Sequence, residues 1–177
     1  MEIRFGSIED TDDVLAMLDE AVDWLVSQGR TGQWGTEHWS ADTKRVERVR
    51  ALLVEGDLWI AEIDGQPVGA ILLNESPMPY VEPASEPELY VRLLVTSRTH
   101  KGQGIGGALV SFARDEAKRR GIDLLRVDCY GGDDQSLVRF YESAGFVRAF
   151  PFKVGEWPGM VLEQRAISTG DRVPRTE

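Results

Sequence analysis

A glycine-rich loop between an apolar strand and an amphipathic helix constrains this chain more than any other feature. The loop, Lys101–Gly107, follows the apolar run Val91–Val95 and opens a predicted helix that ends at Gly121. Backbone N–H groups at the start of a helix, with no side chains crowding them, form an anion site. A ligand that carries phosphate groups is therefore the first hypothesis for this chain.

Length and composition are those of one domain with a short extension. The chain has 177 residues, of which 42% are hydrophobic, and this is enough to build a core. It has no apolar run of about 18 residues and no visible signal peptide, so we expect a cytoplasmic protein without a membrane partner. The single cysteine, Cys129, excludes an internal disulfide, and with only two histidines we expect no metal site.

The net charge of −10 argues against nonspecific binding of nucleic acid. An acidic surface favours a cationic substrate such as an amine, but solubility accounts for the same charge just as well. A ligand that carries phosphate would then depend on local groups, namely the loop amides and the side chains of Arg98, Lys101 and Arg139.

The order of the predicted elements indicates the α/β fold class. Apolar periodicity and capping residues predict helices over residues 11–28, 40–55, 105–120 and 135–144. Strands are predicted at 3–5, 58–63, 66–73, 88–95, 124–129, 146–153 and 160–164. Asp64 and Gly65 predict a tight hairpin, and Gly155–Gly159 is expected as the turn between the last two strands.

These elements predict a single domain over residues 1–166, followed by a polar tail over 167–177. Its mixed sheet is flanked by helices on its faces, and a strand–helix–strand unit that carries the glycine loop lies at its centre.

Two other interpretations of the glycines remain open from the sequence. Gly102, Gly104 and Gly107 fit the G-x-G-x-x-G pattern of dinucleotide sites, and Asp128 lies near the end of the next strand. Against this, several polar residues separate the preceding strand from the first glycine, and the chain after Asp128 is short for a doubly wound sheet. The second alternative is a structural turn without a ligand, although so many glycines are costly for folding unless a ligand approaches the backbone.

Two motifs taken together resemble the GCN5-related N-acetyltransferase (GNAT) superfamily. Its acyl-CoA loop reads Arg/Gln-x-x-Gly-x-Gly/Ala, and Lys101–Gly106 fits with lysine in the first place. Its later element reads Asn-x-x-Ala-x-x-x-Tyr-x-x-x-Gly-Phe. Tyr141 and the pair Gly145-Phe146 match that element, whereas Asp134 and Leu137 replace its asparagine and alanine. The order of strands is also similar, so the resemblance covers nearly the whole chain.

The resemblance implies a ternary complex of acetyl-CoA and an amine, with direct attack by the amine. The backbone of Leu94 and Val95 would pair with the pantetheine arm like an added strand, which requires an open edge beside their strand. Asp134 stands at a further cofactor position of the family, where it could also cap the last helix. The pyrophosphate would be held by the loop at Lys101, Gly102, Gln103, Gly104, Ile105 and Gly106.

The resemblance also implies two catalytic side chains, Tyr141 and Glu88. The phenol of Tyr141 would protonate or orient the departing CoA thiolate, with core packing as the alternative role. A general base must take a proton from the ammonium substrate, and the family often supplies a carboxylate on or before the central strand. Glu88 lies there, and strand alternation predicts that it shares one face with Tyr90, Arg92 and Leu94.

The acceptor side is expected at Trp24, Trp34 and Asp128. In this superfamily the first helical region commonly lines the acceptor pocket, and an aromatic wall could select amines by shape or by cation–π contact. Core packing for Trp24 and a surface position for Asp128 are the alternatives.

We therefore expect an acetyl-CoA-dependent N-acetyltransferase that acts on a small-molecule amine. A protein lysine or N-terminal amine is the first alternative acceptor, and a non-catalytic acyl-CoA sensor is an alternative of another class. The final hairpin could pair across a two-fold axis in a homodimer.

Overall fold

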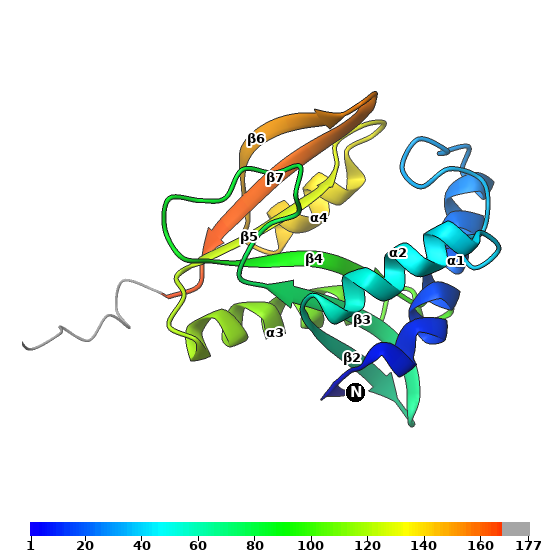
Figure 1. Cartoon of the computed structure of the whole chain (residues 1–177), viewed down its shortest axis with the longest axis horizontal. Helices are drawn as coiled ribbons and strands as arrows, with labels where there is room; N and C mark the ends of the chain where they lie inside the picture. The colour runs from blue at the N-terminus through cyan, green and yellow to red at the C-terminus, as the bar shows by residue number, and fades with distance from the viewer. Residues whose placement is uncertain (168–177) are drawn as a thin grey trace, which may run out of the picture.

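A mixed seven-stranded sheet organises the computed structural model, which describes residues 1–167 (Figure 1). The strand order is β1-β2-β3-β4-β5-β7-β6, and β4–β5 is the parallel pair. The α/β class with a central strand–helix–strand unit is thereby confirmed. The elements are β1 (Glu2–Phe5), η1 (Ile8–Asp10), α1 (Thr11–Ser27), α2 (Thr43–Val54), β2 (Asp57–Ile63), β3 (Gln66–Asn74), β4 (Glu88–Thr96), η2 (Arg98–His100), α3 (Ile105–Arg119), β5 (Leu124–Tyr130), α4 (Ser136–Ser143), β6 (Val147–Val154) and β7 (Trp157–Arg165).

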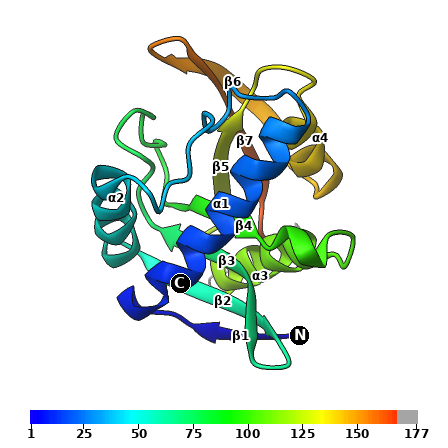
Figure 2. The same cartoon turned by 90° about the vertical axis from the view of Figure 1, so that its right-hand side faces the viewer.

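Helices cover the sheet on both faces, and in Figure 2 α1 lies across the front of it. On one face, Leu109 of α3 and Val138 of α4 belong to the larger apolar cluster. On the other face, Leu18 of α1 and Leu53 of α2 pack with Leu72 of β3. Burial on both faces explains why the central strands are nearly continuous apolar runs.

A β-bulge interrupts β4 at Arg92. Leu72 of β3 pairs with Leu93, but the next residue, Leu73, pairs with Val91, so Arg92 is an extra residue on the β4 side. A bulge of this kind bends its strand and shifts the alternation of side chains by one residue.

The shift corrects the predicted face of β4. Leu94 packs with the cluster under α3 and α4, whereas Tyr90 belongs to a separate cluster that includes Val161 of β7. Leu94 therefore does not share a face with Glu88 and Tyr90 as predicted, because the extra residue at Arg92 breaks the two-residue period.

β4 and β5 pair over only part of their length. Residues Glu88 to Val91 pair with Leu124 to Val127, and beyond these β4 continues beside β3 while β5 continues beside β7. Figure 1 shows the two strands diverging. After Val91, the edge of β4 that faces β5 has no partner strand among the described residues.

The hairpins are close to the prediction, with one correction. Asp64 and Gly65 have φ angles of +51° and +73°, as a tight turn with two left-handed residues requires. The predicted turn Gly155–Gly159 is too long, because β7 begins at Trp157 and Pro158 already pairs with Lys153 of β6. Proline is tolerated there because β5 ends opposite the next residue.

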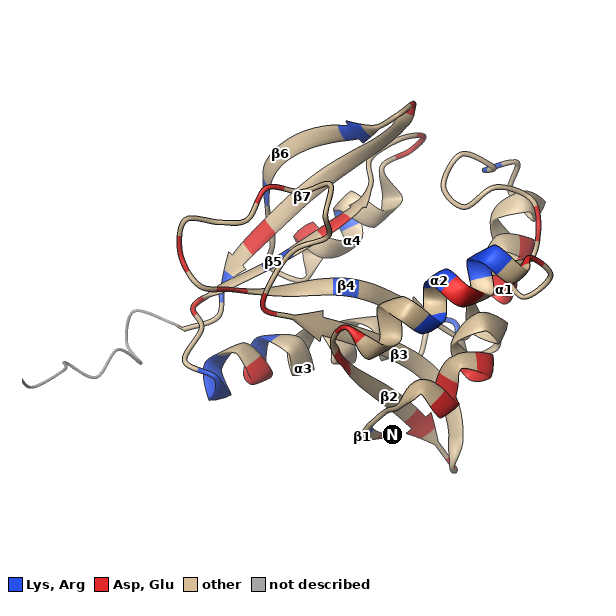
Figure 3. Cartoon of the chain, in the orientation of Figure 1, with Lys and Arg blue, Asp and Glu red and all other residues tan. Residues whose placement is uncertain are grey.

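The outer surface bears on the predicted homodimer, the charge pattern and the predicted tail. β6 is an edge strand with exposed Val147 and Val154, but nothing in the described chain tests the predicted homodimer. Figure 3 shows both signs of charge along α2. No helix within residues 1–167 has the length and apolar character needed to cross a bilayer. The predicted polar tail lies outside the described residues except for Ile167, whose N–H donates to Asp123 at 2.9 Å.

Close packing of α3 on β3 at Gly69 can be tested by substitution. A Cβ at Gly69 would lie 2.8 Å from Ile105 Cγ2 and 2.9 Å from Leu109 Cδ1. We expect Gly69→Ala to destabilise the protein by about 1–3 kcal/mol, seen as a lower urea midpoint. Gly107→Ala is the control, because open space surrounds its added Cβ and alanine favours a helix. Equal midpoints for the two variants would contradict the close packing.

Candidate active site

The glycine loop forms a cradle of free amides at the N-terminus of α3. Gly102 and Gly104 have φ angles of +84° and +73°, which glycine adopts without strain. No described residue accepts a hydrogen bond from the backbone N–H groups of Gly102, Gly104, Ile105, Gly106 and Gly107. Amides that converge at a helix N-terminus suit the oxygens of a phosphate group.

Gln103 differs from its neighbours in the loop. Its N–H donates to the carbonyl of His100 at 3.3 Å, so this amide is used within the turn. η2 connects β4 to the loop. At its start, the hydroxyl of Ser97 and the backbone N–H of Arg98 donate to the carboxylate of Glu20 on α1, at 2.9 and 2.6 Å. The loop is thus held to α1.

The sheet order also excludes the doubly wound sheet of the dinucleotide alternative.

A cavity of about 440 Å³ lies over this cradle, and we call it the first cavity. Leu94 and Val95, at the open edge of β4, form part of its wall together with the loop, α4 and the last turns of α1. The structure therefore brings together all the predicted cofactor residues except Gln103 and Asp134.

Three cations surround the ring of Trp24 in the first cavity. The guanidinium carbons of Arg98 and Arg30 lie 3.9 and 5.5 Å from its centroid, and the ammonium of Lys101 lies at 5.6 Å. Trp24, which was predicted for the acceptor side, lines this cavity. The ring holds a cluster of positive charge beside the free amides.

Both arginines of this cluster have side-chain donors without partners. The Nε and Nη2 atoms of Arg98 and the Nε atom of Arg30 are buried, and no described residue accepts from them. Burial also lowers the pKa of Arg98 from its ordinary value. Buried donor atoms without acceptors are costly, so an anionic ligand that accepts from them would stabilise this cluster. Arg30 was not predicted from the sequence, where it is one residue after a helix-ending glycine.

Asp134 lies at the rim and not in the cavity wall. Its carboxylate accepts from Arg30 Nη2 at 2.8 Å and from the backbone N–H of Ser136, in the first turn of α4, at 3.0 Å. These contacts agree with the helix-capping alternative, and they orient Arg30.

A second cavity of about 290 Å³ lies under the loop that follows α1, the segment 75–87 and the β6–β7 hairpin. Its wall is rich in aromatic side chains, and Trp34 and Asp128, both predicted for the acceptor side, belong to it. The two cavities meet, because both are lined by Gln33, Trp34, Leu94, Leu137 and Tyr141.

Tyr141 lies at this junction of the two cavities as a neutral phenol, which can donate a proton. Its side chain is 5% exposed, and its phenol oxygen has no hydrogen-bond partner among the described residues. Burial, followed by the charges of Cys129 and Asp128, raises the pKa of Tyr141 above its ordinary value. The phenol is therefore neutral at physiological pH and available to a ligand in either cavity.

Asp128 presents a carboxylate to the second cavity. Its oxygens accept from the phenols of Tyr90 at 2.6 Å and Tyr80 at 3.2 Å. Burial raises the pKa of Asp128, while the two phenols partly offset that rise. The surface alternative for this residue is therefore wrong.

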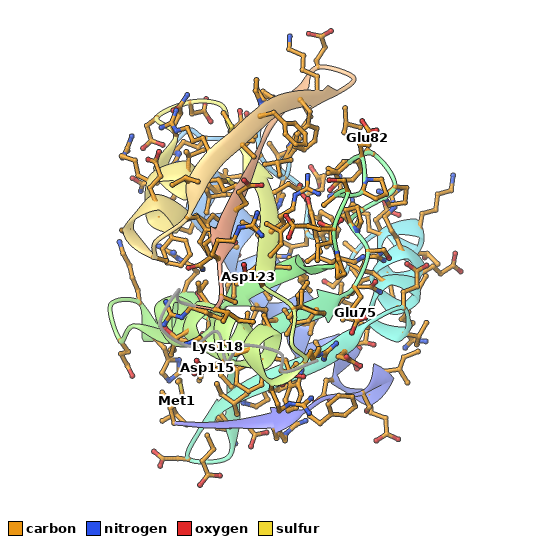
Figure 4. The ribbon with its side chains drawn as sticks, turned by 90° about the vertical axis from the view of Figure 1, so that its left-hand side faces the viewer. Met1, Glu75, Glu82, Asp115, Lys118 and Asp123 are labelled. Carbon is orange, nitrogen blue, oxygen red and sulfur yellow. The ribbon has the colours of Figure 1, made fainter. Side chains whose placement is uncertain are left out.

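Glu88 lines neither cavity, which corrects its predicted role as the base. Its carboxylate pairs with Arg126 at 2.9 Å, with the two side chains 3% and 4% exposed, and also accepts from the backbone N–H of Ala84 at 2.9 Å. The pair fastens the segment 75–87 to the sheet. Figure 4 shows Glu75 and Glu82 far apart on this segment.

A contact that the sequence did not reveal closes the roof of the junction. The indole N–H of Trp157 donates to the carbonyl of Gln33 at 2.9 Å, and its ring lies 5.6 Å from that of Tyr130. A Cβ at Gly32 would collide with the Tyr130 hydroxyl, so a larger residue there would require the Tyr130 ring to move. We call this contact the clasp. Within residues 1–167, no three His, Cys, Asp or Glu side chains are grouped to hold a metal ion.

Comparisons with known proteins agree with this architecture. The sequence model of the acetyltransferase (GNAT) family matches residues 16–146. The chain is 34% identical over 97 residues to N-acetyltransferase family 8 member 2 of Rattus norvegicus. That match covers 54% of this chain but only 40% of the rat protein.

Two solved structures share the fold. Ribosomal-protein-alanine N-acetyltransferase from Brucella melitensis superposes with a TM-score of 0.66 at 19% identity, over 93% of this chain and 99% of that one. The structure of yncA from Salmonella typhimurium, determined with its cofactor acetyl-CoA, has a TM-score of 0.63 at 19% identity, over 100% and 99% of the two chains.

The chain belongs to the acetyltransferase (GNAT) family. The family predicted from the glycine loop and the Tyr141 element is thus confirmed. So is the enzyme class, an acetyl-CoA-dependent N-acetyltransferase, at the level of the family.

The structural role of Glu88 predicts a large loss of stability on truncation. We expect Glu88→Ala to lower the free energy of unfolding by about 3–5 kcal/mol, because it leaves the buried Arg126 unpaired. Glu86→Ala is the matched control, since Glu86 pairs with Arg165 at 2.7 Å while both side chains are about half exposed. That pair should contribute about 1 kcal/mol or less. Chemical denaturation measures both variants, and equal losses would contradict the structural role.

Proposed function

We propose that the chain transfers an acetyl group from acetyl-CoA, bound in the first cavity, to a primary amine in the second. The observation that carries this proposal is the meeting of the two cavities at Tyr141 and Leu94. A thioester and an amine held on opposite sides of this junction would approach each other without crossing solvent.

The groups that line the first cavity suit acetyl-CoA. The free amides of the glycine loop suit its pyrophosphate, with Lys101 beside them, and the unpaired donors of Arg98 and Arg30 suit a further phosphate oxygen. The open edge of β4 at Leu94 and Val95 suits the amide groups of the pantetheine arm, which would add as a strand. Of the predicted cofactor contacts, Gln103 and Asp134 are not retained.

The acetyl-CoA thioester supplies the activated acetyl group, and residues of the chain handle the protons. A C–N bond forms, the C–S bond breaks, and sulfur leaves as a thiolate. Tyr141 gives its phenol proton to that sulfur, and the phenolate then takes a proton from the new amide nitrogen. The net reaction releases one proton, which comes from the substrate ammonium.

A small-molecule amine fits the acceptor side best. The second cavity is roofed by the loop after α1, with Trp34 and the clasp, and its volume of about 290 Å³ is small. A protein N-terminal amine is the second candidate, because the similar Brucella melitensis structure is a ribosomal-protein-alanine N-acetyltransferase. A non-catalytic acyl-CoA sensor would use the first cavity alone.

Cofactor binding can be measured by isothermal titration. We expect micromolar affinity for acetyl-CoA and no binding of NADH. Arg98→Ala should weaken binding by about tenfold or more, because a charge-assisted hydrogen bond contributes roughly 1.5–3 kcal/mol. Arg50→Ala is the control, since Arg50 is an exposed arginine of α2 that lines neither cavity. A folded protein that fails to bind acetyl-CoA would sink the proposed function.

The role of Tyr141 can be measured as amine-dependent release of the CoA thiol. We expect Tyr141→Phe to lower kcat by about 100-fold or more while the affinity for acetyl-CoA stays within about twofold. Phe112→Leu, which changes a ring of α3 that lines neither cavity, is the control. A sensor would release no thiol in either form. Full turnover in Tyr141→Phe would remove this residue from the mechanism.

A further inference from the structure

The second cavity contains one group that can receive a proton from an ammonium ion. Asp128 is the only carboxylate among the described residues that line it, and no described histidine does so. Burial raises the pKa of the Cys129 thiol to about 12, so this neighbour stays protonated. Tyr141, which is neutral, is placed to give a proton and not to take one.

The surroundings of Asp128 fix both carboxylate oxygens. Tyr90 of β4 and Tyr80 of the segment 75–87 each donate to a different oxygen, so the carboxylate cannot rotate freely. A carboxylate has room for further donors beside these two, and an ammonium group is one of them. Stacking of Tyr80 on Phe152 of β6, with ring centroids 5.6 Å apart, holds the Tyr80 phenol in place.

The rest of the cavity is suited to an apolar body. Trp34, Trp39, Met78 and Leu52 are among its wall residues, and they offer no charge. The cations in the wall are Arg48 and Arg92. Arg92 is held by Glu55 and by the carbonyls of Ser76 and Pro77, whereas no described residue pairs with Arg48. A second ammonium on the substrate would meet this unpaired positive charge.

We propose that Asp128, oriented by Tyr80 and Tyr90, binds and deprotonates the ammonium group of a monoamine whose body is apolar and of aromatic size. This inference rests on the proposed function and adds its base and its substrate class. The ammonium gives one proton to the carboxylate, which leaves a neutral amine with a free electron pair beside the junction. Asp128 returns to its charged form by releasing that proton to water after the product leaves.

The pH dependence follows from the groups that face Asp128. These are Tyr80, Tyr90, Cys129 and Tyr141, of which all four have raised pKa values and stay neutral near pH 7. The charge of Arg92 partly offsets the rise in the pKa of Tyr80, and the charge of Arg126 does the same for Tyr90. Asp128 must be deprotonated to act, so kcat/KM should rise with pH through its pKa, which lies above the ordinary range.

The test compares Asp128→Asn and Tyr80→Phe with wild type, using phenethylamine as acceptor. We expect Asp128→Asn to lower kcat/KM by about 100-fold or more and to lose the acid limb of the pH profile, with acetyl-CoA affinity within about twofold. Tyr80→Phe should move that limb to higher pH, because it removes a hydrogen bond that stabilises the carboxylate. Asp115→Asn, on the surface of α3 (Figure 4), should leave both unchanged.

The substrate class is tested with phenethylamine, spermidine and a lysine peptide. We expect kcat/KM for phenethylamine to exceed that for spermidine by about tenfold or more. Asp128→Asn within about threefold of wild type, or an unmoved limb in Tyr80→Phe, would overturn the role of Asp128. Preference for spermidine or the peptide would overturn the substrate class while leaving acetyl transfer intact. Absence of acetyl-CoA binding would overturn the proposed function itself.

Discussion

The site depends on the point at which β4 leaves β5. Up to Val91 the two strands are joined by a parallel ladder, and after the bulge at Arg92 the edge of β4 is open. One extra residue therefore has two effects. It bends the strand away from its neighbour, and it turns Leu94 toward α3 and α4 while Tyr90 faces the other side. The first effect leaves the edge of β4 open beside the first cavity, and the second places the Tyr90 phenol where it donates to Asp128.

Two carboxylates near this point have opposite roles because their surroundings differ. Glu88 is neutralised by Arg126 and is closed off from both cavities, so it contributes to stability and fixes the segment 75–87. Among the described side chains, Asp128 accepts hydrogen bonds only from two phenols, and it lines the second cavity. Burial without a cation raises the pKa of a carboxyl group, so the carboxylate of Asp128 takes up a proton more readily than an exposed one.

The sequence predicted the elements and the glycine loop well, because both depend on local patterns. Periodicity located α1, α3 and the strands, and the glycines located the cradle of amides. The base was mistaken, since alternation from Glu88 assumed an uninterrupted strand and no local signal marks a bulge at Arg92. The sequence also did not show that Trp24 lines the cavity over the glycine loop. Which cavity a helix residue faces depends on packing between elements that are distant in the chain.

The sequence did not predict the position of Arg30, the clasp or the aromatic wall of the second cavity. Each combines residues from segments at opposite ends of the chain, such as Arg30 with Asp134 and Gln33 with Trp157. Charge and aromatic content are visible in the sequence, but the partner of each side chain is not.

The clasp also bears on how the site comes into being. Gln33 and Trp157 are 124 positions apart, so the contact closes a very long loop of chain. Contacts of such separation form late, after the sheet between them is in place. During synthesis, the glycine loop and α3 emerge well before β7. A growing chain would thus contain the glycine loop before it contains Trp157, which closes the junction of the two cavities. It could bring two substrates together only once β7 has been made.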